Sequence, residues 1–472
     1  MLIPRAYDAG DGPRRHPLGD GEVVLVVAAA VFGVWSRSVV AVWAVALVAG
    51  AVSKRTLVLI TCLAIGCAGA WRSQVEWRDA VPLHIGHYSG WVTVVGDPAV
   101  FGSGLRVTVE VEGQRFDAWV YGSPRRRLVD RQAGDVIFVE GSRRLMSSHA
   151  RRAQIRHVVG QLDVDTVGDW HDGSRLYRTS SRVRTALRRA AESTIGGADA
   201  ALFTGLVIGD DAREPQSMVT DFRTSGLSHL TAVSGENVAF LLAAASPALR
   251  RMRPWWRWSA TLGLIAWFMT VTRFEPSVLR AGVMAMLASS AFALGRPQPV
   301  VRLLAWTVAI LALLDPMLVW SVGFWLSTGA TAGVCVLAPR LAELLPGPAW
   351  LRLPLSVTLG AQAGVALPSW LVFHQLPLVS LPANLLAVPV AGFVMLVGIP
   401  AGLIAAALPP VAAVAMAPCT VGTRWVATVA YIGSRLEPPR VWAAVGWILV
   451  LVVVAVLIAR RHWRCRLDNV SI

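Results

Sequence analysis

The stretch Gly226-Leu227-Ser228-His229-Leu230-Thr231-Ala232-Val233-Ser234-Gly235, followed at once by Glu236, opens a long series of apolar segments. A histidine, a glutamate and two glycines are costly at the start of a membrane span, because no water is available there to satisfy polar groups. Such residues usually face a cavity or another helix. The stretch therefore predicts polar side chains inside a helical membrane protein.

The composition of the chain is that of a membrane protein. Of 472 residues, 55% are hydrophobic and only 15% are charged, and the mean hydropathy is +0.55. These values lie outside the usual range of soluble proteins. The 44 Lys and Arg residues exceed the 29 Asp and Glu residues, which gives a formal charge of +15. Basic cytoplasmic loops account for part of this excess, and an anionic polymer as partner is the second explanation.

The apolar segments predict about twelve membrane crossings. Residues 22–70 hold three of them, each shorter than a full span prefers, and they are Val23–Trp35, Val39–Val52 and Thr56–Ala70. The nine in residues 226–459 are 227–246, 256–272, 277–295, 302–314, 317–338, 354–373, 378–406, 411–432 and 441–459.

The charges of the loops predict the orientation. The loops that this count places in the cytoplasm are basic, as around Arg250, whereas the outer loops hold Glu275 and Asp315. Only the outer loop with Arg435 departs from the pattern. Because positive charge collects on cytoplasmic loops, we expect a multi-pass protein of the inner membrane. Its N-terminus (1–21, disordered) and its basic tail (460–472) would both be cytoplasmic.

Residues 71–175 differ from the rest of the chain, because valines alternate with polar residues between glycine-rich turns. Val107, Val109 and Val111 are one such run. Short alternating strands separated by turns are typical of a small β-barrel. The fold class that we predict is a polytopic α-helical membrane protein with an inserted, extracytoplasmic OB-like barrel. Residues 176–225 follow as an arginine-rich amphipathic surface helix region.

The β-domain carries an arginine cluster with two interpretations. It is either an ordinary solvated face or a groove that binds the phosphates of a nucleic-acid strand. Aromatic residues in the same domain either stack on bases or pack in the core, and they are Trp91, Phe116, Trp119 and Tyr121. The candidate DNA-binding residues are Arg125, Arg126, Arg127, Arg143, Arg144, Arg151 and Arg152.

Polar residues within the apolar segments are candidates to line a channel. His229 and Glu236 are seven apart and share a face if their helix is continuous. They either satisfy one another in a structural cluster or line a hydrated pore, and Arg280 would snorkel outward or pair with Glu236. Three prolines, Pro382, Pro389 and Pro400, predict a broken helix, which suits a conduit and equally a transporter. The candidate channel-lining residues are His229, Ser234, Glu236, Asn237, Arg280 and Asn384.

Four motifs carry a resemblance to a known family. They are Gly226–Gly235, Pro276–Ala285, Asp315-Pro316 with Gly323-Phe324-Trp325-Leu326-Ser327, and Pro382–Pro389. In order and spacing they resemble the ComEC family, the membrane channels of bacterial competence that take up DNA. At Glu236-Asn237 the family usually has a hydrophobic residue and then histidine. Many members also continue into a metallo-β-lactamase-like domain with an H-x-H-x-D-H metal site. This sequence contains no such motif, so we expect strand degradation to reside elsewhere.

The resemblance implies inward transport of single-stranded DNA across the membrane. The sequence contains no Walker A motif, no Ser/His/Asp arrangement and no paired-carboxylate site, so we expect no enzymatic activity, cofactor or metal. The expected partners are single-stranded DNA, membrane lipids and separate DNA-receptor, nuclease and motor proteins; the oligomeric state is open. The alternatives are a secondary transporter or pore for a small anionic solute, and a degenerate homologue with a structural role in the envelope.

Overall fold

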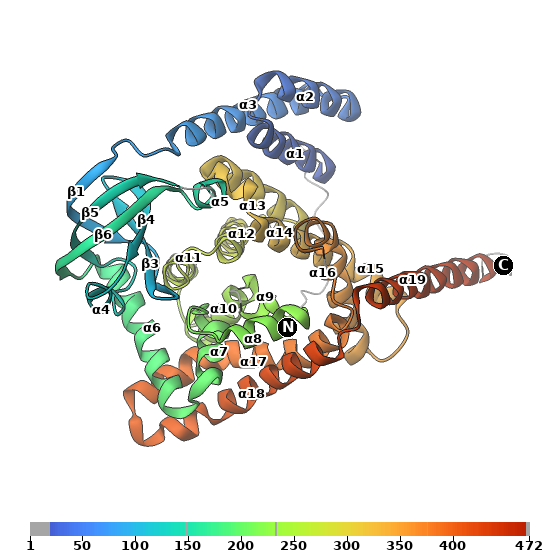
Figure 1. Ribbon diagram of the computed structural model, residues 1–472. Coiled ribbons are helices and arrows are strands. Elements are labelled where there is room, and N and C mark those ends of the chain that lie inside the picture. The colour runs from blue at the N-terminus through green and yellow to red at the C-terminus, as the bar shows by residue number, and fades with distance from the viewer. Residues whose placement is uncertain (1–18, 147–149, 232–233, 375, 469–472) are drawn as a thin grey trace.

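The structure is a computed structural model that describes residues 19–146, 150–231, 234–374 and 376–468. Most of the sequence predicted as a disordered N-terminus, and the last residues of the basic tail, lie outside these ranges. The described chain is mostly helical with one small mixed sheet (Figure 1).

The chain begins with three antiparallel helices, α1 (Asp20–Ser36), α2 (Val39–Ser53) and α3 (Thr56–Asp79). Gly33 of α1 lies directly against the backbone of Gly66 in α3, where a Cβ atom would collide with the Gly66 carbonyl. Small residues allow such close approach of membrane helices. The helices α1 and α3 are longer than the apolar segments predicted for them, and α3 runs nine residues past Ala70.

The β-domain is a six-stranded mixed sheet in the order β1-β5-β6-β4-β3-β2. All pairs are antiparallel except β4–β6, which is parallel, and β1 also pairs with β3 at Thr93–Glu110 and Val94–Val109. The closed barrel that the sequence predicts is wrong: the sheet is not a barrel, and β1 and β3 pair at only these two positions. The predicted valine run packs inward, since Val107, Val109 and Val111 belong to the core of the sheet. The strands are β1 (Gly86–Val94), β2 (Ala99–Phe101), β3 (Gly104–Val111), β4 (Gln114–Val120), β5 (Val136–Leu145) and β6 (Val158–His171), with the short helices α4 (Arg125–Leu128) and α5 (Ala150–Gln154) between them.

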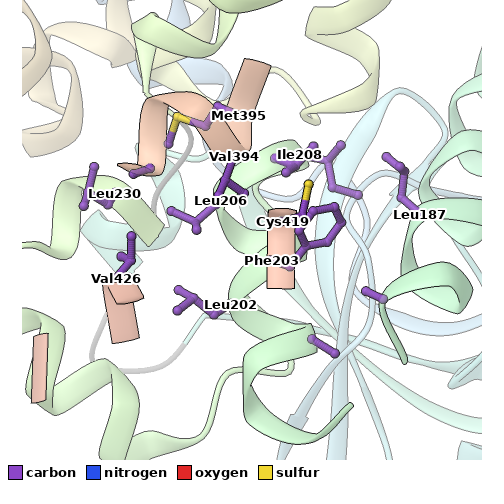
Figure 2. Packing of buried hydrophobic residues seen from close by; sticks show 14 of the residues in the cluster. Leu187, Leu202, Phe203, Leu206, Ile208, Leu230, Val394, Met395, Cys419 and Val426 are labelled. Carbon is purple, nitrogen blue, oxygen red and sulfur yellow. The ribbon is translucent and has the colours of Figure 1, made fainter. Parts of the chain in front are cut away.

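Four helices connect the sheet to the second half of the chain: α6 (Arg175–Thr194), α7 (Gly197–Ile208), α8 (Gln216–Thr224) and α9 (Ser228–Thr231). The apolar face of α6, including Leu187, packs into the largest core of the molecule together with Phe203 and Leu206 of α7. Figure 2 shows these side chains meeting Val394 and Cys419 from helices near the C-terminus. The apolar face of α6 is thus buried against protein.

The remaining helices surround the centre of the molecule, apart from the last, which projects away from the others (Figure 1). They are α10 (Gly235–Leu249), α11 (Pro254–Val271), α12 (Pro276–Ala293), α13 (Val300–Leu314), α14 (Val322–Val336), α15 (Ala338–Leu344), α16 (Ala349–Phe373), α17 (Ser380–Ala407), α18 (Ala412–Leu436) and α19 (Arg440–Asp468), with 3-10 turns η1 (Pro316–Trp320) and η2 (Pro409–Val411).

Among the described residues, five helices are long and apolar enough to cross a membrane, or six if the bent pair α14–α15 is one span. They are α3, α12, α16, α17 and the apolar part of α19. The prediction of about twelve spans is therefore not confirmed. Helices of 15 residues such as α2 and α13 rise only about 22 Å, which is less than the ~30 Å hydrocarbon core.

The helix that the prolines were expected to break is continuous. α17 runs from Ser380 to Ala407 with Pro389 and Pro400 inside it, and Pro382 lies in its first turn, where a missing N–H costs little. The bend occurs instead between α14 and α15, at 43°.

Among the described residues, two sets of ion pairs fix the β-domain to the helices. In the first set, the Asp97 carboxylate accepts hydrogen bonds from Arg184 Nη2 of α6 at 2.8 Å and from Arg273 Nη2 at 2.9 Å. In the second, His157 lies between two carboxylates, with Nδ1 at 3.2 Å from Glu76 and Nε2 at 3.0 Å from Asp315. The sheet therefore lies at the end of the bundle where the loops with Arg273 and Asp315 emerge.

Candidate functional site: a polar cavity shared by the sheet and the helices

One large cavity, about 2350 Å³, extends between the β-domain and the helices. Its lining includes Glu110 and Arg115 of the sheet, His157 beside it, and side chains from α10, α12, α14, α16 and α17. Figure 1 shows these helices arranged around a common centre, with the sheet at one side. The cavity is thus lined by both parts of the molecule.

Five of the six candidate channel-lining residues lie on this cavity: His229, Ser234, Glu236, Arg280 and Asn384. The sixth, Asn237, is buried behind it. The Asn237 Nδ2 donates to the Leu206 carbonyl at 2.9 Å, and its Oδ1 accepts from Ser234 Oγ at 3.2 Å. Asn237 therefore anchors α10 to α7.

His229 and Glu236 do not share a continuous helix. His229 belongs to the short helix α9, and Glu236 lies in the first turn of α10, which begins after the N-cap residue Ser234. Ala232 and Val233, between them, lie outside the described residues. The seven-residue spacing thus does not place the two side chains on one helical face, although both reach the same cavity.

Arg280 forms no ion pair with Glu236 and does not snorkel outward. It is only 5% exposed, and its Nε donates to Ser327 Oγ of α14 at 2.9 Å. A Cβ atom on Gly235 would lie 2.7 Å from Arg280 Nη2, so the guanidinium rests against the first residue of α10. Glycine at this position is what admits the arginine.

Asn384 of α17 is 6% exposed and lines the same cavity. Its Oδ1 is buried without a hydrogen-bond donor among the described residues. Leaving a buried acceptor unsatisfied costs about 1–3 kcal/mol. A protein usually keeps such a group only where a ligand or water can reach it.

At the side of the sheet, the cavity meets a buried ion network that the sequence did not reveal. Arg184 contacts Asp97 and also Asp210, which in turn accepts Arg188 Nη2 at 2.6 Å. Burial opposes ionisation of Asp97, yet the guanidinium groups of Arg184 and Arg273 hold its pKa down to about 2. Asp97 was visible in sequence only as a turn residue, and its partner Arg184 is 87 residues away.

Close to this network, the pKa of Glu214 is shifted in the opposite direction to that of Asp97. Burial, and then the negative charges of Asp211 and Asp210, raise the pKa of Glu214 to about 8. Its Oε1 is buried without a partner among the described residues. The described residues hold no group of three or more His, Cys, Asp or Glu side chains that could bind a metal ion.

The seven candidate DNA-binding arginines are not gathered in one groove. Figure 1 shows α4, with Arg125–Arg127, and α5, with Arg151, at different ends of the sheet. Several are already engaged by other residues. Arg127 Nη1 donates to the Val167 carbonyl at 2.7 Å, and Arg125 donates to the Ser103 carbonyl. Arg143 forms an ion pair with Glu112, and Arg144 forms one with Asp163. Arg151 lies over the ring of Trp320. Arg126 and Arg152 are exposed and form no ion pair or side-chain hydrogen bond with the described residues.

The aromatic candidates separate into core and surface. Phe116 is buried in the core of the sheet, whereas Trp91 and Tyr121 are exposed. Trp119 stacks on Tyr121, with ring centroids 6.4 Å apart, and Phe101 lies 6.0 Å from Trp119 on the other side. Arg106 lies over the Phe101 ring. These four residues form a row on one face of strands β2, β3 and β4.

A helical bundle with apolar helices, a polar cavity and a small docked sheet defines a polytopic membrane protein. Residues 206–462, more than half of the chain, match the family described as Competence protein, and the chain belongs to this family. The resemblance found in the four sequence motifs is thereby confirmed.

Two curated relatives are similar to parts of this chain. "Uncharacterized protein YcaI" of Escherichia coli strain K12 is 27% identical over 212 residues, which is 41% of this chain and 28% of that protein. "ComE operon protein 3" of Bacillus subtilis strain 168 is 27% identical over 203 residues, 42% of this chain and 26% of that protein. The match thus spans little more than a quarter of either relative. No solved structure matches this chain significantly.

Proposed function

We propose that this protein is an inner-membrane channel that conducts single-stranded DNA into the cell during transformation, and that its β-domain receives the strand. The observation that supports this most is the cavity lined jointly by sheet and helices. A strand bound at the sheet enters such a cavity without crossing lipid. Membership of the competence protein family supports a role in DNA uptake.

The β-domain is proposed to be OB-like. Its parallel β4–β6 pair and the pairing of β1 with both β5 and β3 support this assignment. The row of Phe101, Trp119 and Tyr121 with Arg106 supports strand binding, because bases stack on aromatic rings and phosphates attract arginine. The row brings aromatic rings and an arginine together, whereas the seven candidate arginines are scattered over the β-domain.

The proposed orientation places the β-domain outside the cytoplasm. Its contacts with Arg273 and Asp315 involve the loops that are poor in positive charge. At the start of α13, Arg302 pairs with Asp20 of α1 at 2.6 Å, so those two helix starts lie together. Both observations support a cytoplasmic N-terminus, and the basic tail supports the same side for the C-terminus.

We further propose that the chain itself is not an enzyme. Movement of a polymer through the cavity would then depend on a separate motor, and delivery and degradation on separate receptor and nuclease proteins. The alternative is a pore for a small anionic solute, and the experiment must distinguish it from a channel for DNA.

The test is electrical recording with the purified full chain in planar lipid bilayers. We expect single-stranded oligothymidylate, added to the side of the β-domain, to interrupt the ionic current, and duplex DNA of the same length not to enter. Steady phosphate currents that oligothymidylate leaves unchanged would contradict DNA conduction and support the small-solute pore.

A further inference from the structure

We propose that Arg280, Ser327 and the amino end of α10 form a binding site for one phosphodiester group of the strand inside the cavity. This inference rests on the proposed function, and it adds the position and the chemistry of one contact in the path.

The first observation is that Arg280 is a buried cation without a counter-charge. It is 5% exposed, and no carboxylate of the described residues lies within ion-pair distance of it. Its Nε is bonded to Ser327, and its Nη1 is 4.0 Å from the Met284 sulfur. Its Nη2 has no acceptor among the described residues, and Arg280 lines the cavity. Arginine is almost never buried unless it is paired, so the missing partner is an anion that enters the cavity.

The second observation is that the surroundings hold the guanidinium in place. Ser327 fixes Nε from α14, and Gly235 leaves room for Nη2 against the first residue of α10. α10 is a helix of 15 residues whose N-cap, Ser234, lines the same cavity. The amino end of a helix carries a partial positive charge and favours anions. The arginine and the amino end of α10 therefore both attract an anion to the same place in the cavity.

The geometry favours phosphate over other anions. Guanidinium presents donors in a planar fork that matches two phosphate oxygens, whereas lysine acts only as a point charge. A phosphodiester carries one negative charge, which matches the single uncompensated cation. Glu236, next to Gly235 and on the same cavity, opposes this binding. Conduction requires a ligand to leave again, so a neighbouring carboxylate that weakens the site fits a transport path.

The experiment measures binding of fluorescent oligothymidylate to the full chain in lipid nanodiscs over a range of salt concentrations. We expect Arg280→Gln to weaken binding about tenfold, equivalent to about 1.4 kcal/mol. The slope of log affinity against log salt should fall by about 0.7, since one phosphate contact is lost. Arg280→Lys should recover the slope but not the full affinity. Glu236→Gln should bind more tightly than the wild type.

Two further variants control the result. Arg251→Gln removes the same charge from an exposed loop away from the cavity and should change neither affinity nor slope. Gly235→Ala keeps the charge but displaces Nη2, and it should weaken binding even if Arg280→Gln proves unstable. An oligomer with uncharged methylphosphonate linkages should bind the wild type and Arg280→Gln with equal affinity.

The outcomes separate this inference from the proposed function. If the wild type does not bind oligothymidylate at low salt, the proposed function itself fails. If it binds but Arg280→Gln and Gly235→Ala match it in affinity and slope, the channel proposal stands and this site is wrong. If inorganic phosphate competes as well as the oligomer at equal phosphate concentration, the site serves a small anion.

Discussion

At the scale of single residues, the cavity gathers polar side chains that lipid could not satisfy. Polar residues in apolar segments must face a cavity or a partner, and five of the six chosen on that ground line the cavity. The predicted Arg280–Glu236 pair failed because pairing depends on where α14 brings Ser327. That is a tertiary contact between residues 47 positions apart, which no local spacing encodes.

His157 gives the clearest pH dependence. The hydrogen bond that His157 Nε2 donates to Asp315 raises the pKa of His157 from its ordinary 6.5. Burial lowers this pKa, the charges of Asp315 and Glu76 raise it, and the charge of Arg115 lowers it. Each ring nitrogen faces a carboxylate, so both must donate, which requires the charged imidazolium. A raised pKa in the folded state contributes stability below about pH 6.5 that is lost as pH rises through the raised value. We therefore expect the unfolding temperature of the full chain in nanodiscs to fall over this window.

The measurement must be a difference between variants, because Glu214 titrates in the same window. Its pKa is raised to about 8, so ionisation of this carboxyl also destabilises the fold as pH rises. His157→Gln should flatten the pH dependence in part, whereas His87→Gln, on an exposed part of β1, should leave it unchanged. Parallel curves for His157→Gln and the wild type would show that the histidine is not charged at this contact.

At the scale of elements, periodicity and turn residues located most strands and helices but not their packing. Alternating valines marked the inward face of the sheet correctly. Gly226, Gly235 and Gly323 belong to the sequence motifs, yet a closer helix contact involves other glycines. Gly329 and Gly333 of α14 lie against Gly360 and Gly364 of α16, and a Cβ atom on Gly329, Gly333 or Gly364 would meet backbone carbonyl oxygen. Their four-residue spacing, repeated in both helices, was the sequence signal that could have revealed this contact.

This contact predicts opposite effects for two glycines of the same helix. Alanine normally stabilises a helix relative to glycine by up to about 1 kcal/mol. Gly323→Ala should follow that rule, because its Cβ would meet only Ser321 Oγ at 3.8 Å. Gly333→Ala should instead destabilise by about 1–3 kcal/mol, since the methyl group would force α14 and α16 apart.

Denaturant unfolding of the two variants in mixed micelles measures the difference. The expected result is a lower midpoint for Gly333→Ala and an equal or higher midpoint for Gly323→Ala. Equal gains in both variants would mean that α14 and α16 are not in close contact in the membrane.

At the scale of the whole molecule, the sequence predicted a helical membrane protein with a β insert, and this coarse architecture is confirmed. The predicted number of spans is not confirmed. Hydropathy identifies apolar stretches, but it does not show whether the helix that forms is long enough to cross the membrane. α13, for example, covers the predicted span 302–314 but has only 15 residues, and several of them pack in a protein core. Burial in protein and burial in lipid have the same sequence signal over so short a length.

The orientation of the molecule remains a prediction that labelling can check. In a variant without native cysteines, Ser123→Cys on the exposed turn before α4 should react with a membrane-impermeant maleimide in intact cells. Met252→Cys, exposed between α10 and α11, should react only after lysis. The reverse pattern would place the β-domain in the cytoplasm and remove its role as the receiver of external DNA.

The contact between Arg302 and Asp20 has a consequence for the synthesis of the chain. The two residues are 282 positions apart, and a ribosome adding about 5–20 residues per second needs roughly 15–55 s to cover that distance. During this interval α1 has no α13 to pack against, so the first three helices must persist in the bilayer by their own contacts. The Gly33–Gly66 approach supplies such a contact from the start. The N-terminal helices therefore form a template early, and α13 packs onto this surface once residues 300–314 have been made.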